Sequence, residues 1–209
     1  MLGITSFGLF LLTAFLMNII PGTDTTYIVS KSVSQGRKAG VYSVLGISTG
    51  SLVHAFLAAV GLSVILTTSV VLFTAIKILG AAYLVYLGVK MLFQSSSNMK
   101  LSATKDLSIK KIYMQGFITN VANPKVALFF ISFLPQFIAT DNSYGPFPFI
   151  ILGLSFVMTG TFWCLIVANF SSYVTKKLRN NSKIEYLLNK LTGIIFIGLG
   201  IKLFQTKAP

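Results

Sequence analysis

Residues 39–76 read AGVYSVLGISTGSLVHAFLAAVGLSVILTTSVVLFTAI, a run of 38 positions without an Asp, Glu, Lys or Arg. A helix needs only about 20 apolar residues to cross the hydrocarbon core of a bilayer. The run is therefore too long for one crossing, and Thr67-Thr68-Ser69 is its natural break. We expect two adjacent membrane spans here, one near 41–66 and the next near 70–93.

The whole chain shares this apolar character. Of its 209 residues, 54% are hydrophobic and 10% are charged, and the mean hydropathy is +0.81. About one quarter of a soluble domain is charged, and a disordered chain has low hydrophobicity, so both classes are excluded. The apolar runs are continuous rather than alternating, which favours membrane helices over a β-barrel. We expect an all-α integral membrane protein with one domain over residues 1–209.

Four further spans fit the remaining sequence and bring the expected total to six. Residues 1–23 have no charged side chain, so the first span is expected to begin near Gly3. Pro124 interrupts the fourth span, as Pro21 interrupts the first. The last three spans are expected near 112–138, 147–173 and 186–205.

The six expected spans form two halves, 1–94 and 112–209, joined by a linker at 95–111. The halves resemble each other at three places, at offsets of 110 to 113 residues. The matching pairs are Gly50-Ser-Leu-Val53 with Gly160-Thr-Phe-Trp163, Lys77-Ile-Leu-Gly80 with Lys190-Leu-Thr-Gly193, and Leu87–Gln94 with Leu199–Gln205. Three spans per half require the halves to insert with opposite orientation, and such an inverted 3+3 repeat is typical of transporters. The alternative is chance similarity between apolar helices.

Positive charges indicate how the spans are oriented. The chain has 17 Lys and Arg against 4 Asp and Glu, a formal net charge of +13. In a soluble protein this charge would suggest nucleic acid, but here it lies in clusters between apolar runs, so we expect no nucleic-acid partner. The positive-inside rule then places the loops after spans one, three and five in the cytoplasm of a bacterial inner membrane, with both termini outside. The clusters are Lys31, Arg37 and Lys38; Lys90, Lys100, Lys105, Lys110 and Lys111; and Lys176, Lys177, Arg179, Lys183 and Lys190.

Proline breaks the first and fourth spans at similar places, in Asn18-Ile-Ile-Pro21-Gly22-Thr23-Asp24 and in Asn120-Val-Ala-Asn123-Pro124-Lys125. A proline removes a backbone donor, and the freed carbonyl groups at membrane depth need a partner. Paired breaks in two halves indicate a binding site, and the alternative is a pair of structural kinks. The candidate substrate-binding or coupling residues are Asn18, Pro21, Gly22, Asp24, Asn120, Asn123, Pro124 and Lys125.

Two charged residues stand out at these breaks. Asp24 is the only acidic residue near the bilayer, because the other three lie in expected loops. A carboxylate at this depth is costly and usually functional: it would carry a proton or bind a substrate ammonium group. The alternative is a helix N-cap. Lys125 lies far from other charges in sequence, so we expect it to meet a carboxylate of the protein or of a substrate.

Gly46-Ile-Ser-Thr-Gly50 fits the G-x-S-x-G pattern of a serine nucleophile, but the pattern lacks a base. The only histidine, His54, lies about 9 Å along the same helix and about 120° around it from the serine. Small residues at this spacing favour close helix packing instead. His54 itself is interpreted as a packed polar side chain or as part of a proton path.

No other motif predicts a cofactor, a metal site or catalysis. The single Cys164 lies in an apolar run, without metal-ligand spacing, and forms no intrachain disulfide. The chain has no P-loop, no dinucleotide fingerprint and no HExxH motif. We therefore expect neither an enzyme nor a transporter that hydrolyses ATP itself.

Three segments resemble the LysE/RhtB family of amino-acid exporters: Pro21–Gly40, Gly80–Gly88 and Gly116–Phe130. The resemblance covers nearly the whole chain in the same order. It implies an exporter of small amino acids in a bacterial inner membrane, powered by the proton gradient. The family has Pro-Gly-Pro at the first break, whereas Thr23 replaces the second proline here. The kink is expected to survive on Pro21 alone.

The leading hypothesis is a secondary transporter that exports neutral amino acids, similar to threonine, homoserine or leucine, by proton antiport. Export of another solute is the alternative within transport, and a metal is disfavoured by the scarcity of ligands. A membrane enzyme lacks acid–base pairs, and a structural scaffold would not need proline breaks. The expected partners are an amino acid, protons and lipid, and self-association stays open.

Overall fold

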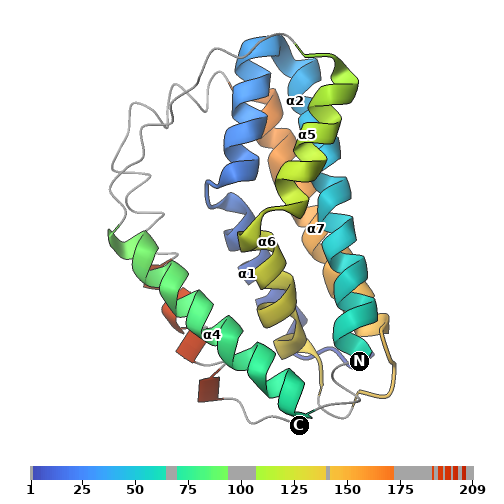
Figure 1. Cartoon of the computed structure of the whole chain (residues 1–209), viewed down its shortest axis with the longest axis vertical. Coiled ribbons are helices and arrows are strands. Elements are labelled where there is room, and N and C mark those ends of the chain that lie inside the picture. Colours follow the sequence, from blue (N-terminus) through green and yellow to red (C-terminus); the bar gives the residue numbers. More distant parts are fainter. Residues whose placement is uncertain are drawn as a thin grey trace.

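The computed structural model describes residues 2–64, 70–93, 107–139 and 142–171, together with 190, 193–194, 196–198, 200–201 and 204–205 (Figure 1). Within these residues the secondary structure is helical, apart from one isolated bridge between Ile4 and Ile138. Two segments are long and apolar enough to cross a membrane, Thr23–Leu62 and Phe147–Asn169. A bent pair of helices, Ile109–Val121 and Pro124–Phe137, gives a third if it is counted as one span. The all-helical, apolar architecture expected from the sequence is confirmed for the described residues.

The first break separates α1 (Phe7–Ile19) from α2 (Thr23–Leu57). α2 folds back on itself at Gly36, which has φ 81° and ψ 176°, so it consists of a first arm (23–35) and a second arm (37–57). A left-handed φ of this kind favours glycine. The second arm continues into the π-helical segment η1 (Ala58–Leu62).

The expected loop between the first two spans needs correction. The helix continues through Lys31 as far as residue 35, and only the glycine turn separates the two arms. The second arm also begins earlier than the expected range of 41–66, and the helix continues as far as residue 64, the last described residue of this stretch. A helix can continue through basic residues once it has left the hydrocarbon core of the bilayer. The positive charges therefore indicate where the chain leaves the lipid and not where the helix ends.

α4 (Val70–Phe93) has the bounds expected for the third span. It runs antiparallel to the last described stretch, since Gly88 lies against Gly193 and Ile197, and Gly200 lies against Ala81 and Val85. The break at 67–69, residues 95–106 of the linker and most of the expected sixth span lie outside the described residues.

The second break separates α5 (Ile109–Val121) from α6 (Pro124–Leu128), with a bend of 45°. α6 continues through the π-helical η2 (Phe129–Phe133) into the 3-10 helix η3 (Leu134–Phe137). Asn123 is the N-cap of α6, where its side chain accepts a hydrogen bond from the backbone N–H of Lys125 at 3.0 Å. α7 (Phe147–Asn169) is a straight apolar helix.

α5 lies against both arms of α2 (Figure 1). It is antiparallel to the first arm, because Asp24 bonds Asn120 while Gln35 bonds the carbonyl of Leu107. It packs closely on the second arm, where a Cβ on Gly46 would overlap the Tyr113 carbonyl oxygen and one on Gly50 would lie 2.8 Å from Asn120 Oδ1. The interpretation of these glycines as close-packing residues is confirmed.

Apart from those at the two breaks, the described helix ends gather at two opposite ends of the bundle. At one end, Gln35 contacts Leu107 and the Arg37 side chain bonds Asn169. At the other end, the first residues bond the segment after η3, through Thr5 N to Phe137 O at 2.8 Å and Ala139 N to Gly3 O at 2.8 Å. A core rich in phenylalanine fills the part of the bundle near Thr5 and Phe137. A smaller, mainly aliphatic core fills the part near Gln35 and Arg37. Between the two cores lie the helix breaks.

Candidate functional site

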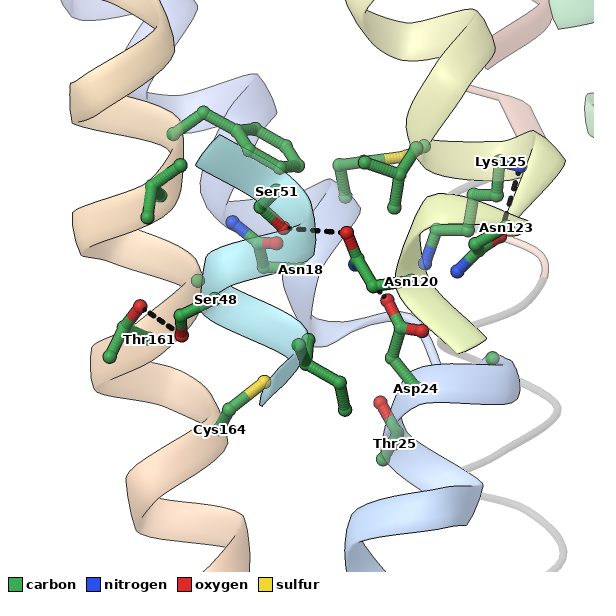
Figure 2. Close-up of a pocket in the computed structure, with 17 residues that line it drawn as sticks. Asn18, Asp24, Thr25, Ser48, Ser51, Asn120, Asn123, Lys125, Thr161 and Cys164 are labelled. Atoms are coloured by element: carbon green, nitrogen blue, oxygen red, sulfur yellow. Dashed lines mark hydrogen bonds between the residues drawn. The ribbon is translucent and has the colours of Figure 1, made fainter. Parts of the chain in front are cut away.

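A cavity lies where the two helix breaks meet (Figure 2). Both breaks contribute to its wall, together with the second arm of α2 and with α7. Six of the eight candidate residues line it, and Pro21 and Pro124 lie directly beside residues that do. The six are Asn18, Gly22, Asp24, Asn120, Asn123 and Lys125.

Asp24 lies in the first turn of α2 and turns its carboxylate toward the second break. Its Oδ2 accepts a hydrogen bond from Asn120 Nδ2 at 2.7 Å, while its Oδ1 is buried and has no hydrogen-bond partner among the described residues. Gly22 holds the N-cap position of this helix, and no side chain caps it. The interpretation of Asp24 as an N-cap is therefore wrong, and its carboxylate has an acceptor site to spare.

Lys125 lies in the first turn of α6 and reaches across to the first break. Its Nζ donates to the carbonyl oxygen of Ile20 at 3.0 Å. That carbonyl lies outside the helical hydrogen-bond ladder, because α1 ends at Ile19. A Cβ on Gly22 would lie 3.7 Å from Nζ, so the ammonium group also approaches the start of α2. An ammonium has three donors, and two of them remain for other groups.

Asn120 connects the second break to the second arm of α2. Its side chain is 1% exposed, donates to Asp24 and accepts from Ser51 Oγ at 3.2 Å. Its carbonyl, which proline at 124 deprives of a helical partner, is 2.9 Å from the N–H of Asn123 and 3.2 Å from His54 Nε2. Since a carbonyl only accepts, Nε2 carries the hydrogen in this arrangement.

His54 is buried behind the cavity and does not line it. Its ring stacks on Phe130 at a centroid distance of 6.0 Å and an interplanar angle of 17°. Asn120 alone separates it from Asp24 in the chain of hydrogen bonds. This position suits a packed polar side chain, and it also places an imidazole two bonds away from the carboxylate.

The hydrogen bonds at the two breaks cross from one break to the other. Lys125 from the second break satisfies a carbonyl of the first, and Asp24 from the first accepts from Asn120 of the second. Asn18 belongs to neither link: its Nδ2 is 3.4 Å from Thr159 Oγ1 on α7. The breaks are thus held together by charged groups that lie on the cavity wall.

Sequence reasoning missed the opposite wall of the cavity. There Ser48 on the second arm of α2 faces Thr161 on α7, with their hydroxyl oxygens 2.7 Å apart, and Cys164 lies nearby. Ser48 belongs to the Gly46–Gly50 segment that was interpreted only as a packing motif. Thr161 belongs to the repeat match of Gly50-Ser51 with Gly160-Thr161, and Ser51 also lines the cavity. That match was the available signal.

The cavity residues do not resemble a metal centre. Among the described residues, no three His, Cys, Asp or Glu side chains gather. The wall instead presents one carboxylate, one ammonium, three amides and several hydroxyl groups, which is the chemistry of a site for a small polar solute.

The chain matches the family described as LysE type translocator over residues 15–207. The protein belongs to this family. As a LysE type translocator it is a membrane transporter and not an enzyme, and both the sequence resemblance and the exclusion of catalysis are confirmed.

Curated relatives cover nearly the full length of this translocator. It is 40% identical over 198 residues to the uncharacterised membrane protein YrhP of Bacillus subtilis (strain 168), which covers 90% of this chain and 93% of the relative. It is 28% identical over 202 residues to the leucine efflux protein of Salmonella choleraesuis (strain SC-B67), covering 96% and 95%. The leucine efflux protein of Salmonella typhimurium (strain LT2) is similar to the same extent. No solved structure matches the chain.

Proposed function

We propose that this translocator exports small neutral amino acids or close analogues across a bacterial inner membrane in exchange for protons. The observation that carries the proposal is the cavity wall on which Asp24 and Lys125 lie together, each with unused hydrogen-bonding capacity. A zwitterion needs one acceptor and one donor region at close range, and this wall supplies both. The relatives named leucine efflux proteins support the same substrate class.

The two ends of the wall would bind the two ends of the substrate. Asp24 Oδ1 would accept from the ammonium group, since nothing else bonds this oxygen. Lys125, together with the uncapped N-terminus of α2, would donate to the carboxylate, because both favour negative charge. Met17, Ile47 and Val157 add apolar surface to the cavity, which permits several side chains of similar size.

Proton exchange would follow from competition for one carboxylate. A proton on Asp24 removes the charge that holds the ammonium group, and departure of the proton restores it. The site would then carry either a proton or an amino acid, and this alternation is what antiport requires. Asp24 is the one carboxylate on the cavity wall, and His54 stays a candidate for a second group on the proton path.

The architecture proposed for this exchange is an inverted repeat of three spans, with the first and fourth spans broken at Pro21 and Pro124. Two contacts support it. α4 is antiparallel to the last described stretch, and the first arm of α2 is antiparallel to α5. The first of these contacts joins segments that the sequence match relates, within 77–94 and 190–205. In this arrangement the end of the bundle that carries Arg37 and Lys38 faces the cytoplasm, and both termini face outward.

Efflux from proteoliposomes loaded with labelled leucine, valine or threonine tests the proposal. We expect an acidic exterior to accelerate efflux, and a protonophore to abolish the acceleration. The Asp24→Asn variant keeps the shape of the side chain but cannot exchange a proton, so it should lose the gradient-driven efflux by about tenfold or more. Lys38→Ala, at an exposed lysine far from the cavity, is the control. Wild-type efflux that ignores the gradient, or no efflux of any amino acid, would contradict the proposal.

A further inference from the structure

Ser48 and Thr161 form a pair of hydroxyl groups on the cavity wall that faces Asp24 and Lys125 (Figure 2). Their oxygens are 2.7 Å apart, and either one is able to donate to the other. Ser48 comes from the second arm of α2 and Thr161 from α7. Neither residue serves the proposed recognition of the ammonium and carboxylate groups.

The pair behaves differently from four other hydroxyl groups on the same two helices. Serine and threonine in a membrane helix usually donate to the carbonyl four residues earlier. On these helices that bond is made by Ser43, Thr49, Ser155 and Thr159. Ser48 and Thr161 instead bond each other across the interface.

This arrangement leaves hydrogen-bonding capacity at the cavity. Two hydroxyl groups carry two hydrogens, and their mutual bond uses one. The structure describes no acceptor for the second hydrogen among the residues around the cavity. An unpaired donor away from water costs about 1 to 3 kcal/mol, so a polar group inside the cavity would stabilise it.

We infer that Ser48 and Thr161 form a subsite for a small polar side-chain group, and that they make the translocator prefer amino acids with a side-chain hydroxyl over apolar isosteres. This inference rests on the proposed function, because the charged wall must hold the amino group and the carboxylate. The side chain of the bound amino acid then extends toward α7 and meets the hydroxyl pair. A hydroxyl group of the substrate takes up the free donor, whereas a methyl group leaves it unpaired.

Threonine and valine are the matched substrates for the test, since they differ only by a hydroxyl in place of a methyl group. Competition between the two in one vesicle preparation gives a transport ratio that does not depend on the amount of folded protein. We expect the wild type to prefer threonine by about tenfold, the effect of one unpaired donor. Thr161→Val with Ser48→Ala should bring the ratio close to one, through a higher half-saturation concentration for threonine.

Ser155→Ala and Ser43→Ala are the controls, because they remove hydroxyl groups of the same two helices that donate to their own backbone and do not line the cavity. Both should keep the wild-type ratio. A ratio near one in the wild type, or a threonine preference that survives the double substitution, overturns the inference and leaves the proposed function intact. If the wild type transports neither amino acid, the proposed function fails and the inference fails with it.

Discussion

Asp24 and Lys125 are proposed to bind different groups of the substrate, so substitutions at the two positions should weaken the binding of different ligands. Lys125→Ala should weaken the binding of leucine about tenfold or more, but should weaken binding of the matching amine, 3-methylbutylamine, far less, because the amine has no carboxylate for Lys125 to bind. Asp24→Ala should weaken binding of the amine more than that of the matching carboxylic acid. The affinities for leucine, for the amine and for the carboxylic acid are measured by how strongly each inhibits the exchange of labelled leucine.

Lys125→Arg separates charge from position in this experiment. The guanidinium group keeps a cation near Ile20 O and should retain part of the leucine affinity. Equal losses for leucine and the amine in Lys125→Ala would show that Lys125 acts only by holding the first break together.

Two substitutions of His54 distinguish a packed polar side chain from a group on the proton path. His54→Gln keeps an amide donor for the Asn120 carbonyl but has no group that exchanges protons. We expect this variant to retain proton-driven efflux, because the histidine is packed against Phe130 and bonded to backbone. His54→Leu should lower the free energy of unfolding by about 1 kcal/mol. A folded His54→Gln variant that exports without responding to the gradient would place His54 on the proton path.

Single residues at the breaks were predictable because proline and charge are rare in apolar sequence. Asp24, Asn120 and Lys125 stood out for this reason, and the structure brings them to one cavity. The crossed bonds between the breaks were not predictable, since sequence does not say which carbonyl a lysine reaches. Ser48 and Thr161 carried little signal, because small hydroxyl residues are common in packed membrane helices.

At the scale of helices, the close interface between α5 and the second arm of α2 depends on glycine, which has no side chain. A Cβ on Gly46 would overlap backbone of α5, which has no room to move within a regular helix. Gly46→Ala should therefore destabilise the protein by about 1 to 3 kcal/mol. Thermal unfolding in detergent, followed by circular dichroism, measures the change.

Gly61→Ala in η1 is the matched control for this substitution. Nothing lies within 4 Å of a Cβ at Gly61, so alanine should be neutral there or raise stability by about 0.5 to 1 kcal/mol through its lower backbone freedom. A Gly46→Ala variant as stable as Gly61→Ala would show that the two helices are not closely packed in solution.

Hydropathy predicted the apolar helices of the described residues but not the shape of the first two expected spans. α4 has its expected range and α7 begins where it was expected, because both helices are mostly apolar. Much of the first arm of α2 was assigned to the loop between the first two spans, because it is more polar than the neighbouring runs and contains Lys31. Charge reports whether a residue lies in lipid, whereas the helix is ended by the left-handed conformation of Gly36.

At the scale of the whole molecule, the orientation in the membrane is testable from two exposed positions at opposite ends. Tyr144 is 52% exposed in the segment before α7, and Lys110 is exposed at the start of α5. In a Cys164→Ser background, an impermeant thiol reagent outside intact cells should label Tyr144→Cys and should label Lys110→Cys only after permeabilisation. The reverse pattern would invert the proposed topology.

The crossed bonds between the breaks also affect how the chain is made. Ile20 O and Asp24 enter the membrane with the first half, whereas Lys125 and Asn120 are still to be synthesised. Until Lys125 and Asn120 are inserted, the Ile20 carbonyl group and the Asp24 carboxylate lie in or near lipid without their partners. The first half is therefore expected to fold poorly by itself and to be degraded by quality-control proteases. Residues 1–94 produced alone should therefore be degraded rapidly, and co-production of residues 95–209 should lengthen their half-life in a pulse–chase experiment. An equally long half-life with and without the second half would show that the first half matures by itself.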